Sequence, residues 1–244
     1  MKILITGAKG FVGKNLCAVL KNLKDGKDKT RPTLNIEEIF EYDIDSIPTD
    51  LDVYCEKADF VFNLAGVNRP QSQEEFIQGN FGFASTLLET LKKYNNKCPV
   101  MISSSIQATL IGRYADGEYG KSKKAGEELF FNYEKNGGGK VCVYRFPNLF
   151  GKWCRPNYNS AVATFCNNIA NDLPIKVNDP SVNMQLIYID DLVRELISAL
   201  NAAPTVMDDG FCHVLPVHKI TLGEIVELLY SFKASRNDLS TLLK

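Results

Sequence analysis

The stretch "KILITGAKGFVGKNLCAVL", residues 2–20, decides the fold. A short apolar, β-branched run leads into a glycine-rich turn, and a segment with helical periodicity follows. Glycine suits such a turn because the backbone must approach a pyrophosphate and the helix must pack closely on the strand. The first N–H groups of the helix then face the phosphate charge. We therefore predict a dinucleotide-binding turn made of Gly7, Lys9, Gly10, Phe11, Val12 and Gly13.

Strands and helices alternate beyond this turn. Apolar runs at 36–42, 58–66, 99–105 and 140–147 read as strands, and 81–94 and the segment after residue 116 read as helices. This alternation indicates parallel βαβ crossovers in a doubly wound α/β sheet, and continuous hydrophobicity indicates strands covered on both faces. We predict a Rossmann core over residues 1–150.

Shorter elements follow residue 150. Helices are expected within 159–171 and 221–232, and a strand leading into a helix within 184–200. The last helix starts with the capping box Thr221–Glu224 and carries an apolar stripe at Ile225, Leu228, Leu229 and Phe232. We predict that residues 151–244 form mainly a substrate-binding lobe, with later segments returning to the core.

Composition narrows the class of protein. The chain has 28 basic and 29 acidic residues, a net charge of -1, and no basic block that would indicate a nucleic acid or a membrane surface as partner. It shows neither a secretory leader nor an apolar run long enough to cross a bilayer. Seven dispersed cysteines without a C-x-x-C pair indicate reduced thiols, so we expect a cytoplasmic protein without a metal site.

The end of the second strand should distinguish between two cofactors. An acid there hydrogen-bonds the ribose 2′-hydroxyl of NAD(H), whereas a basic residue accommodates the 2′-phosphate of NADP(H). Glu41 and Asp43 favour NAD(H), but Lys9, Lys29 and Arg31 could meet a phosphate, so both cofactors stay open. Small residues after the next strand would let the cofactor lie close to the backbone, and these are Leu64, Ala65 and Gly66.

Tyr119 and Lys123, in "DGEYGKSKKAGEELF" (116–130), lie one helical turn apart on the same face. A neighbouring ammonium favours the phenolate, so we expect Lys123 to lower the pKa of Tyr119 towards that of a useful general acid. The serines of "SSSIQAT" (103–109) close a strand at the carboxyl edge of the sheet. A hydroxyl there can hydrogen-bond a substrate carbonyl or alcohol.

The ordered motifs TGxxGxxG, NLAG, SSS, YxxxK and RFPNLFG resemble the extended short-chain dehydrogenase/reductase family, in its nucleotide-sugar branch. The resemblance implies that Tyr119 is the acid/base and that Lys123 lowers its pKa and holds the nicotinamide ribose. It implies that Ser105 orients the substrate, with Ser104 as the second choice, and that Phe146 lies against the cofactor.

A closer resemblance is carried by "NLAGVNRP", "SSSIQAT", "PNLFGKWCRPNYNS" and "TLGEIVELLY", and it extends over essentially the whole chain. These segments resemble reductase domains of capsular polysaccharide synthesis. They imply NADP(H)-dependent reduction of the C4 ketone of a UDP-linked 4-keto-6-deoxy-HexNAc, a UDP-2-acetamido-2,6-dideoxy-hexos-4-ulose, towards UDP-N-acetyl-L-fucosamine in capsular or O-antigen precursor synthesis. Such proteins carry a C-terminal cupin domain that epimerises the sugar, and no such domain follows here. We therefore expect either a fragment or a separate epimerase partner.

Substrate contacts are expected from four further residues. Asn148 matches a position that contacts nucleotide-sugar phosphates in the family, while Lys152 and Arg155 could supply charge for a diphosphate. Arg69, in "GVNRP", is expected near the same site. Relatives commonly dimerise through two long helices per subunit, so a homodimer is expected as well.

Two other functions remain open. A UDP-sugar 4-epimerase would recycle a tightly held NAD, and the carboxylates of Glu41 and Asp43 are compatible with it. A non-catalytic dinucleotide sensor would have little use for Tyr119, Lys123 and the serines together. A 4,6-dehydratase is disfavoured, because it needs an acid/base pair after the serine run, where "IQATLIGRYADG" has Asp116 as its only acid.

Overall fold

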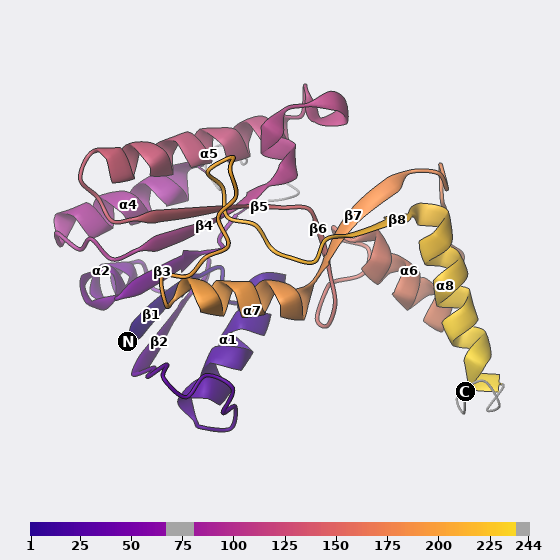
Figure 1. The fold of residues 1–244 in the computed structure, drawn as a ribbon, viewed down its shortest axis with the longest axis horizontal. Coiled ribbons are helices and arrows are strands. Elements are labelled where there is room, and N and C mark those ends of the chain that lie inside the picture. The colour runs from indigo at the N-terminus through magenta and orange to yellow at the C-terminus, as the bar shows by residue number, and fades with distance from the viewer. Residues whose placement is uncertain (67–80, 238–244) are drawn as a thin grey trace. The chain divides into compact units, whose positions relative to one another are not determined.

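A parallel sheet of five strands is the main element of the computed structural model, which describes residues 1–66 and 81–237 (Figure 1). The strand order is β2-β1-β3-β4-β5. The strands are β1 (Lys2–Thr6), β2 (Glu38–Tyr42), β3 (Phe60–Asn63), β4 (Val100–Ser105) and β5 (Val141–Phe146). The predicted doubly wound α/β fold is confirmed, and each strand lies within a segment expected to be extended.

The position of β1 in the sheet creates the ligand-binding edge. β1 pairs in parallel with both β2 and β3, so the chain steps to one side of β1 and then crosses to the other. In open parallel sheets, ligands bind at such a switch point, outside the carboxyl ends of the strands. The glycine turn after β1 and the NLAG segment after β3 lie there, which is what positions the site.

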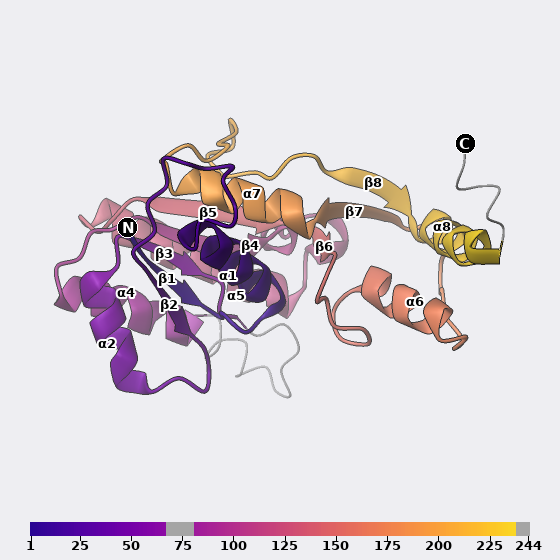
Figure 2. The same cartoon turned by 90° about the horizontal axis from the view of Figure 1, so that it is seen from below.

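Helices cover both faces of this sheet (Figures 1 and 2). On one face lie α2 (Pro48–Lys57), α4 (Phe83–Lys93) and α5 (Glu118–Lys135), whose buried apolar side chains share a core with the strands. Helix α1 (Phe11–Lys24) lies on the opposite face, as right-handed crossovers in opposite directions require. Helix α2 was not predicted, because its segment is polar and buries only Leu51 and Cys55.

The chain divides into two compact units. The first combines residues 1–146 with 193–214, and the second combines 147–192 with the residues from 215 onward. Residues 193–214 are held to β5 by side-chain and backbone hydrogen bonds. The Tyr144 hydroxyl donates to Glu195 at 2.9 Å, and the Cys212 N–H donates to the Val143 carbonyl at 2.8 Å. The role of the second unit in substrate binding stays a prediction.

The second unit has its own small sheet and core. Strands β6 (Asn148–Phe150) and β7 (Asn183–Tyr188) are parallel, and β8 (His218–Thr221) runs antiparallel to β7. Helices α6 (Ala161–Ala170) and α8 (Leu222–Ala234) pack together, while α7 (Ile189–Ala199) leads back to the first unit. The core consists of Phe165, Ile169, Leu186 and Ile225 with partly buried neighbours.

For helix α8, the predicted capping box is confirmed, but the predicted apolar stripe is only partly buried. The Thr221–Glu224 capping box is present. The apolar stripe is only half buried, however, because Leu228 is 45% exposed and Phe232 is 61% exposed. The narrow apolar face of α8 is therefore centred on Ile225. None of the helices in the described ranges is long and apolar enough to cross a membrane.

Candidate active site

The glycine turn has the close packing that a dinucleotide site needs. Gly7 has a φ of +68°, and a Cβ there would lie 2.7 Å from the backbone N of Ala65. A Cβ on Gly13 would lie 2.2 Å from the Gly7 carbonyl oxygen, so α1 packs directly on the turn. Gly10 caps α1 without a side-chain hydrogen bond to the helix N-terminus. The turn thus presents main-chain N–H groups and the positive end of the helix dipole at the sheet edge.

The ends of β1 and β3 are fastened to each other across the switch point. The buried Thr6 hydroxyl donates to the Asn63 side-chain oxygen at 2.7 Å and accepts from the Ala65 N–H at 3.3 Å. The Leu64 N–H donates to the Thr6 carbonyl at 3.2 Å. Leu64, Ala65 and the exposed Gly66 therefore lie beside the glycine turn, where a bound dinucleotide would pass.

Carboxylates dominate the end of β2. Asp43 accepts a hydrogen bond from the Lys9 backbone N–H at 2.7 Å, so it touches the glycine turn. Glu41, in contrast, forms an ion pair with Lys21 of α1 at 2.5 Å. The ammonium of Lys9 is paired with the carboxylate of Asp45, a residue that sequence reasoning did not single out.

Tyr119 lies in the first turn of α5, next to the end of β4. Gly120 allows this approach, since a Cβ there would lie 2.4 Å from the Gln107 carbonyl of the 3-10 helix η2 (Ile106–Thr109). Burial raises the pKa of Tyr119 to about 12, while a side-chain hydrogen bond with Ser105 lowers it. The structure brings together Tyr119 and Ser105, two of the predicted catalytic residues.

Contrary to expectation for a tyrosine paired with Lys123, the pKa of Tyr119 does not lie below its ordinary value, because burial raises it. The Lys123 ammonium donates to the Ser103 carbonyl at 3.1 Å and lies 5.7 Å from the centre of the Tyr119 ring. Lys123 itself is buried, and burial lowers its pKa to about 8, against an opposing attraction from Glu127.

Ser104 and Ser105 have different surroundings. The Ser104 hydroxyl is buried and donates to Glu127 at 2.5 Å. Ser105, by contrast, accepts from the Gln107 N–H at 3.2 Å and lies next to Tyr119. This geometry favours Ser105 over Ser104 as a group that can meet a substrate. Phe146, predicted at the cofactor site, is buried at the end of β5, opposite Ser105 in the strand register.

Glu127 and Arg145 were missed by sequence reasoning. Glu127 is 2% exposed and accepts from Arg145 through both oxygens, from Nε at 2.8 Å and from Nη2 at 2.6 Å. The Arg145 guanidinium lies 3.6 Å from the centre of the Phe211 ring. A signal was available, because a charge inside an apolar strand needs a buried partner, and Glu127 follows Lys123 by one helical turn.

Three of the predicted substrate residues belong to the second unit. Asn148 lies on β6, and its amide donates to the Gln185 carbonyl at 3.4 Å. Lys152 is paired with Asp190 at 2.9 Å. Arg155 is exposed, with its guanidinium 5.6 Å from the centre of the Tyr158 ring. Arg69 lies outside the described residues.

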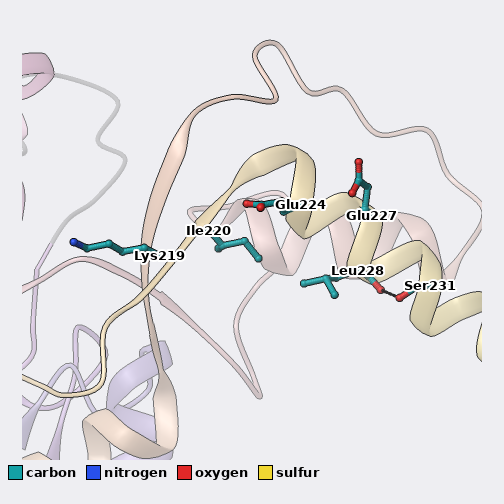
Figure 3. A pocket seen from close by; sticks show the side chains of 6 residues that line it. All are labelled: Lys219, Ile220, Glu224, Glu227, Leu228 and Ser231. Carbon is teal, nitrogen blue, oxygen red and sulfur yellow. Dashed lines mark hydrogen bonds between the residues drawn. The ribbon is translucent and has the colours of Figure 1, made fainter.

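A shallow groove of about 510 Å³ lies along β8 and α8 of the second unit (Figure 3). It contains none of the predicted site residues. Its apolar wall is formed by Ile220 and Leu228, and carboxylates of α8 lie beside it. The complete lining is Lys219, Ile220, Glu224, Glu227, Leu228 and Ser231.

The first unit thus holds two sets of candidate site residues at the carboxyl edge of its sheet. One is the glycine turn, a main-chain cradle that has no room for side chains and that fits a dinucleotide pyrophosphate. The other consists of a partly buried, protonated phenol, a serine hydroxyl and a buried lysine. Such a group can deliver a proton to a carbonyl oxygen.

Comparison with known proteins agrees with this geometry. The family model described as "NAD dependent epimerase/dehydratase family" matches residues 3–208. The chain is 41% identical over 241 residues to a UDP-2-acetamido-2,6-beta-L-arabino-hexul-4-ose reductase of Pseudomonas aeruginosa. That match covers 99% of this chain and 60% of the relative.

Solved structures show the same pattern. The capsular polysaccharide assembling protein CapF from Staphylococcus aureus is 46% identical, with a TM-score of 0.83, over 98% of this chain and 60% of that one. A UDP-glucuronic acid 4-epimerase from Bacillus cereus, in complex with NAD, shares the fold at 20% identity and a TM-score of 0.78, covering 96% and 85% of the two chains. The chain therefore spans about 60% of the length of the two more similar proteins.

Proposed function

The chain belongs to the NAD-dependent epimerase/dehydratase family, and on this premise we propose that it reduces the C4 ketone of a UDP-2-acetamido-2,6-dideoxy-hexos-4-ulose. The observation that carries the proposal is the partly buried Tyr119, whose pKa of about 12 keeps it protonated at neutral pH, beside Ser105 and Lys123. A reductase needs such a proton donor, because hydride addition turns the ketone into an alkoxide.

In the proposed reaction, the bound nicotinamide dinucleotide supplies the hydride to C4. Tyr119 gives its phenolic proton to the C4 oxygen, so the ketone becomes a secondary alcohol and Tyr119 a phenolate. Ser105 donates a hydrogen bond to the same oxygen and holds it in line. The ammonium of Lys123 stabilises the phenolate that forms, since a nearby positive charge favours the anion.

The proposed substrate rests on the similarity of the whole chain to a UDP-linked hexulose reductase. A product on the route to UDP-N-acetyl-L-fucosamine for a capsular or O-antigen polysaccharide fits the likeness to CapF. Asn148, Lys152 and Arg155 are our candidates for the diphosphate. Lys152 would have to exchange its ion pair with Asp190 for the substrate.

For the cofactor, the residues at the end of β2 favour NAD(H) over the NADP(H) that the resemblance implied. Asp43 lies against the glycine turn and can accept from a ribose hydroxyl. The cation nearest to a 2′-phosphate, Lys9, is neutralised by Asp45. Arg31 points elsewhere, and its guanidinium donates to the Ser198 hydroxyl at 3.4 Å.

A UDP-sugar 4-epimerase is the second candidate, favoured by the same carboxylates and by relatives that are named as epimerases. An epimerase begins by removing a proton from the sugar hydroxyl, so its tyrosine must first act as a base. The raised pKa of Tyr119 opposes this first step and supports reduction.

The test follows nicotinamide absorbance with the purified chain and the UDP-linked 4-keto sugar, using NADH and NADPH in separate assays. UDP-N-acetylglucosamine, which has no ketone, is the control substrate. Stoichiometric cofactor oxidation that requires the keto sugar supports the reductase. Interconversion of a UDP-hexose without net oxidation would transfer the assignment to an epimerase.

A further inference from the structure

A buried network behind the proposed catalytic group connects two strands to α5. Ser104 on β4 and Arg145 on β5 are direct neighbours in the strand register, and both donate to Glu127 of α5. The three hydrogen bonds measure 2.5, 2.6 and 2.8 Å. Both oxygens of the carboxylate are therefore occupied, which fixes it in one orientation.

Glu127 lies one helical turn after Lys123, on the same face of α5. The groups that face Lys123 in the described part of the chain are Tyr119 and Glu127 on its own helix and the Ser103 carbonyl on β4. Arg145 stands behind Glu127. Lys123 is only 8% exposed as a residue, so water does little to stabilise its charge.

We propose that Glu127, oriented by Arg145 and Ser104, is a positioning residue that keeps Lys123 charged and in place below Tyr119. A buried ammonium is stable only with a compensating negative charge or with hydrogen bonds. The Ser103 carbonyl supplies one hydrogen bond, and the carboxylate of Glu127 supplies the charge. Arg145 and Ser104 both donate to the carboxylate of Glu127 and hold it in place.

The inference rests on the proposed function in one respect, namely that Lys123 acts on Tyr119 during reduction. Its central claim concerns the protonation of Lys123 and can be tested without substrate. The lysine 13Cε resonances of the labelled full chain are titrated by NMR, and the Lys123 signal is assigned with Lys123→Arg. In Glu127→Gln we expect the midpoint of Lys123 to fall by about one pH unit, because an attracting charge is lost.

Glu128→Gln is the matched control, since Glu128 is the exposed neighbour on the same helix and carries the same charge. It should leave the midpoint unchanged. Glu127→Asp keeps the carboxylate and should restore most of the wild-type midpoint. Equal midpoints in Glu127→Gln and the wild type would overturn the proposal.

Removing one partner of a buried ion pair can unfold a protein, so a second variant is needed. Glu127→Gln combined with Arg145→Gln removes both charges and leaves two neutral amides. A smaller downward shift than in Glu127→Gln is expected there, because the attracting carboxylate and the repelling guanidinium are lost together. A midpoint above that of the wild type would again refute the proposal. In the reduction assay, the alkaline loss of activity should move to lower pH together with the Lys123 midpoint. A wild type without reductase activity would refute the proposed function and leave the titration result standing.

Discussion

Asp43 and Lys9 join the end of β2 to the glycine turn, through a hydrogen bond of 2.7 Å from the Lys9 backbone N–H to the Asp43 carboxylate. The Lys9 side chain points to a different carboxylate, that of Asp45. The main chain and the side chain of one residue are thus both held by acids. A 2′-phosphate bound here would meet negative charge, whereas a ribose hydroxyl would meet an acceptor.

This relationship predicts the cofactor preference. The wild type should use NADH with a KM at least about 10-fold below that for NADPH, since one charged hydrogen bond contributes about 1.5–3 kcal/mol. Asp43→Asn should raise the KM for NADH about 10-fold and so bring it closer to the KM for NADPH. Asp25→Asn, an equal charge change at the exposed end of α1, is the control. A wild type that prefers NADPH would contradict the prediction.

Tyr119→Phe tests the proton donor. The substitution removes only the hydroxyl that would donate the proton, so we expect kcat for ketone reduction to fall about 10²- to 10⁴-fold. Binding of NADH, measured by fluorescence, should change little, because the cofactor cradle is formed by the glycine turn. Tyr114→Phe is the matched control, since that hydroxyl bonds to Arg113 at an exposed position. Equal losses of kcat in both variants would contradict the role of Tyr119 as the proton donor.

Alanine substitutions of the two serines at the end of β4 should have different effects, one on kcat and the other on stability. Ser105→Ala removes the hydroxyl next to Tyr119, so kcat should fall about 10-fold or more while stability changes little. Ser104→Ala removes a buried hydrogen bond to Glu127, and should lower the free energy of unfolding by about 2 kcal/mol. Urea unfolding and steady-state kinetics distinguish the two. A larger kcat loss in a stable Ser104→Ala protein than in Ser105→Ala would reverse the assignment.

The fold could be predicted from sequence because its signals are local. The glycine turn, the apolar strands and the YxxxK spacing each depend on residues close together in the chain. The electrostatics of the site could not, since they depend on burial and on partners brought together by the sheet. Lys123 was expected to lower the pKa of Tyr119, yet burial raises it. Asp45 and Arg145 likewise could not be identified from sequence, because their ion-pair partners, Lys9 and Glu127, are far away in the chain and only the fold brings each pair together.

Lys123 provides the last prediction, which concerns stability. Its pKa falls from 10.5 to about 8 in the folded chain, so the unfolded chain binds more protons between these pH values. Folding is therefore opposed by the buried charge below about pH 8, and the penalty disappears as the pH rises towards 10.5. A shift of this size corresponds to about 3 kcal/mol.

Lys123→Met should therefore be inactive in reduction and yet more stable than the wild type at pH 7, by roughly 1–3 kcal/mol. The difference between the two unfolding free energies should shrink as the pH rises from about 8 towards 10.5, because the folded lysine is then neutral and the unfolded lysine begins to lose its proton as well. Lys124→Met, a substitution at the exposed neighbouring position, should show no such pH dependence. Urea unfolding across this pH range measures the difference. A variant that is less stable than the wild type at pH 7 would mean that the contacts of Lys123 with Ser103 and Glu127 outweigh the cost of burying its charge.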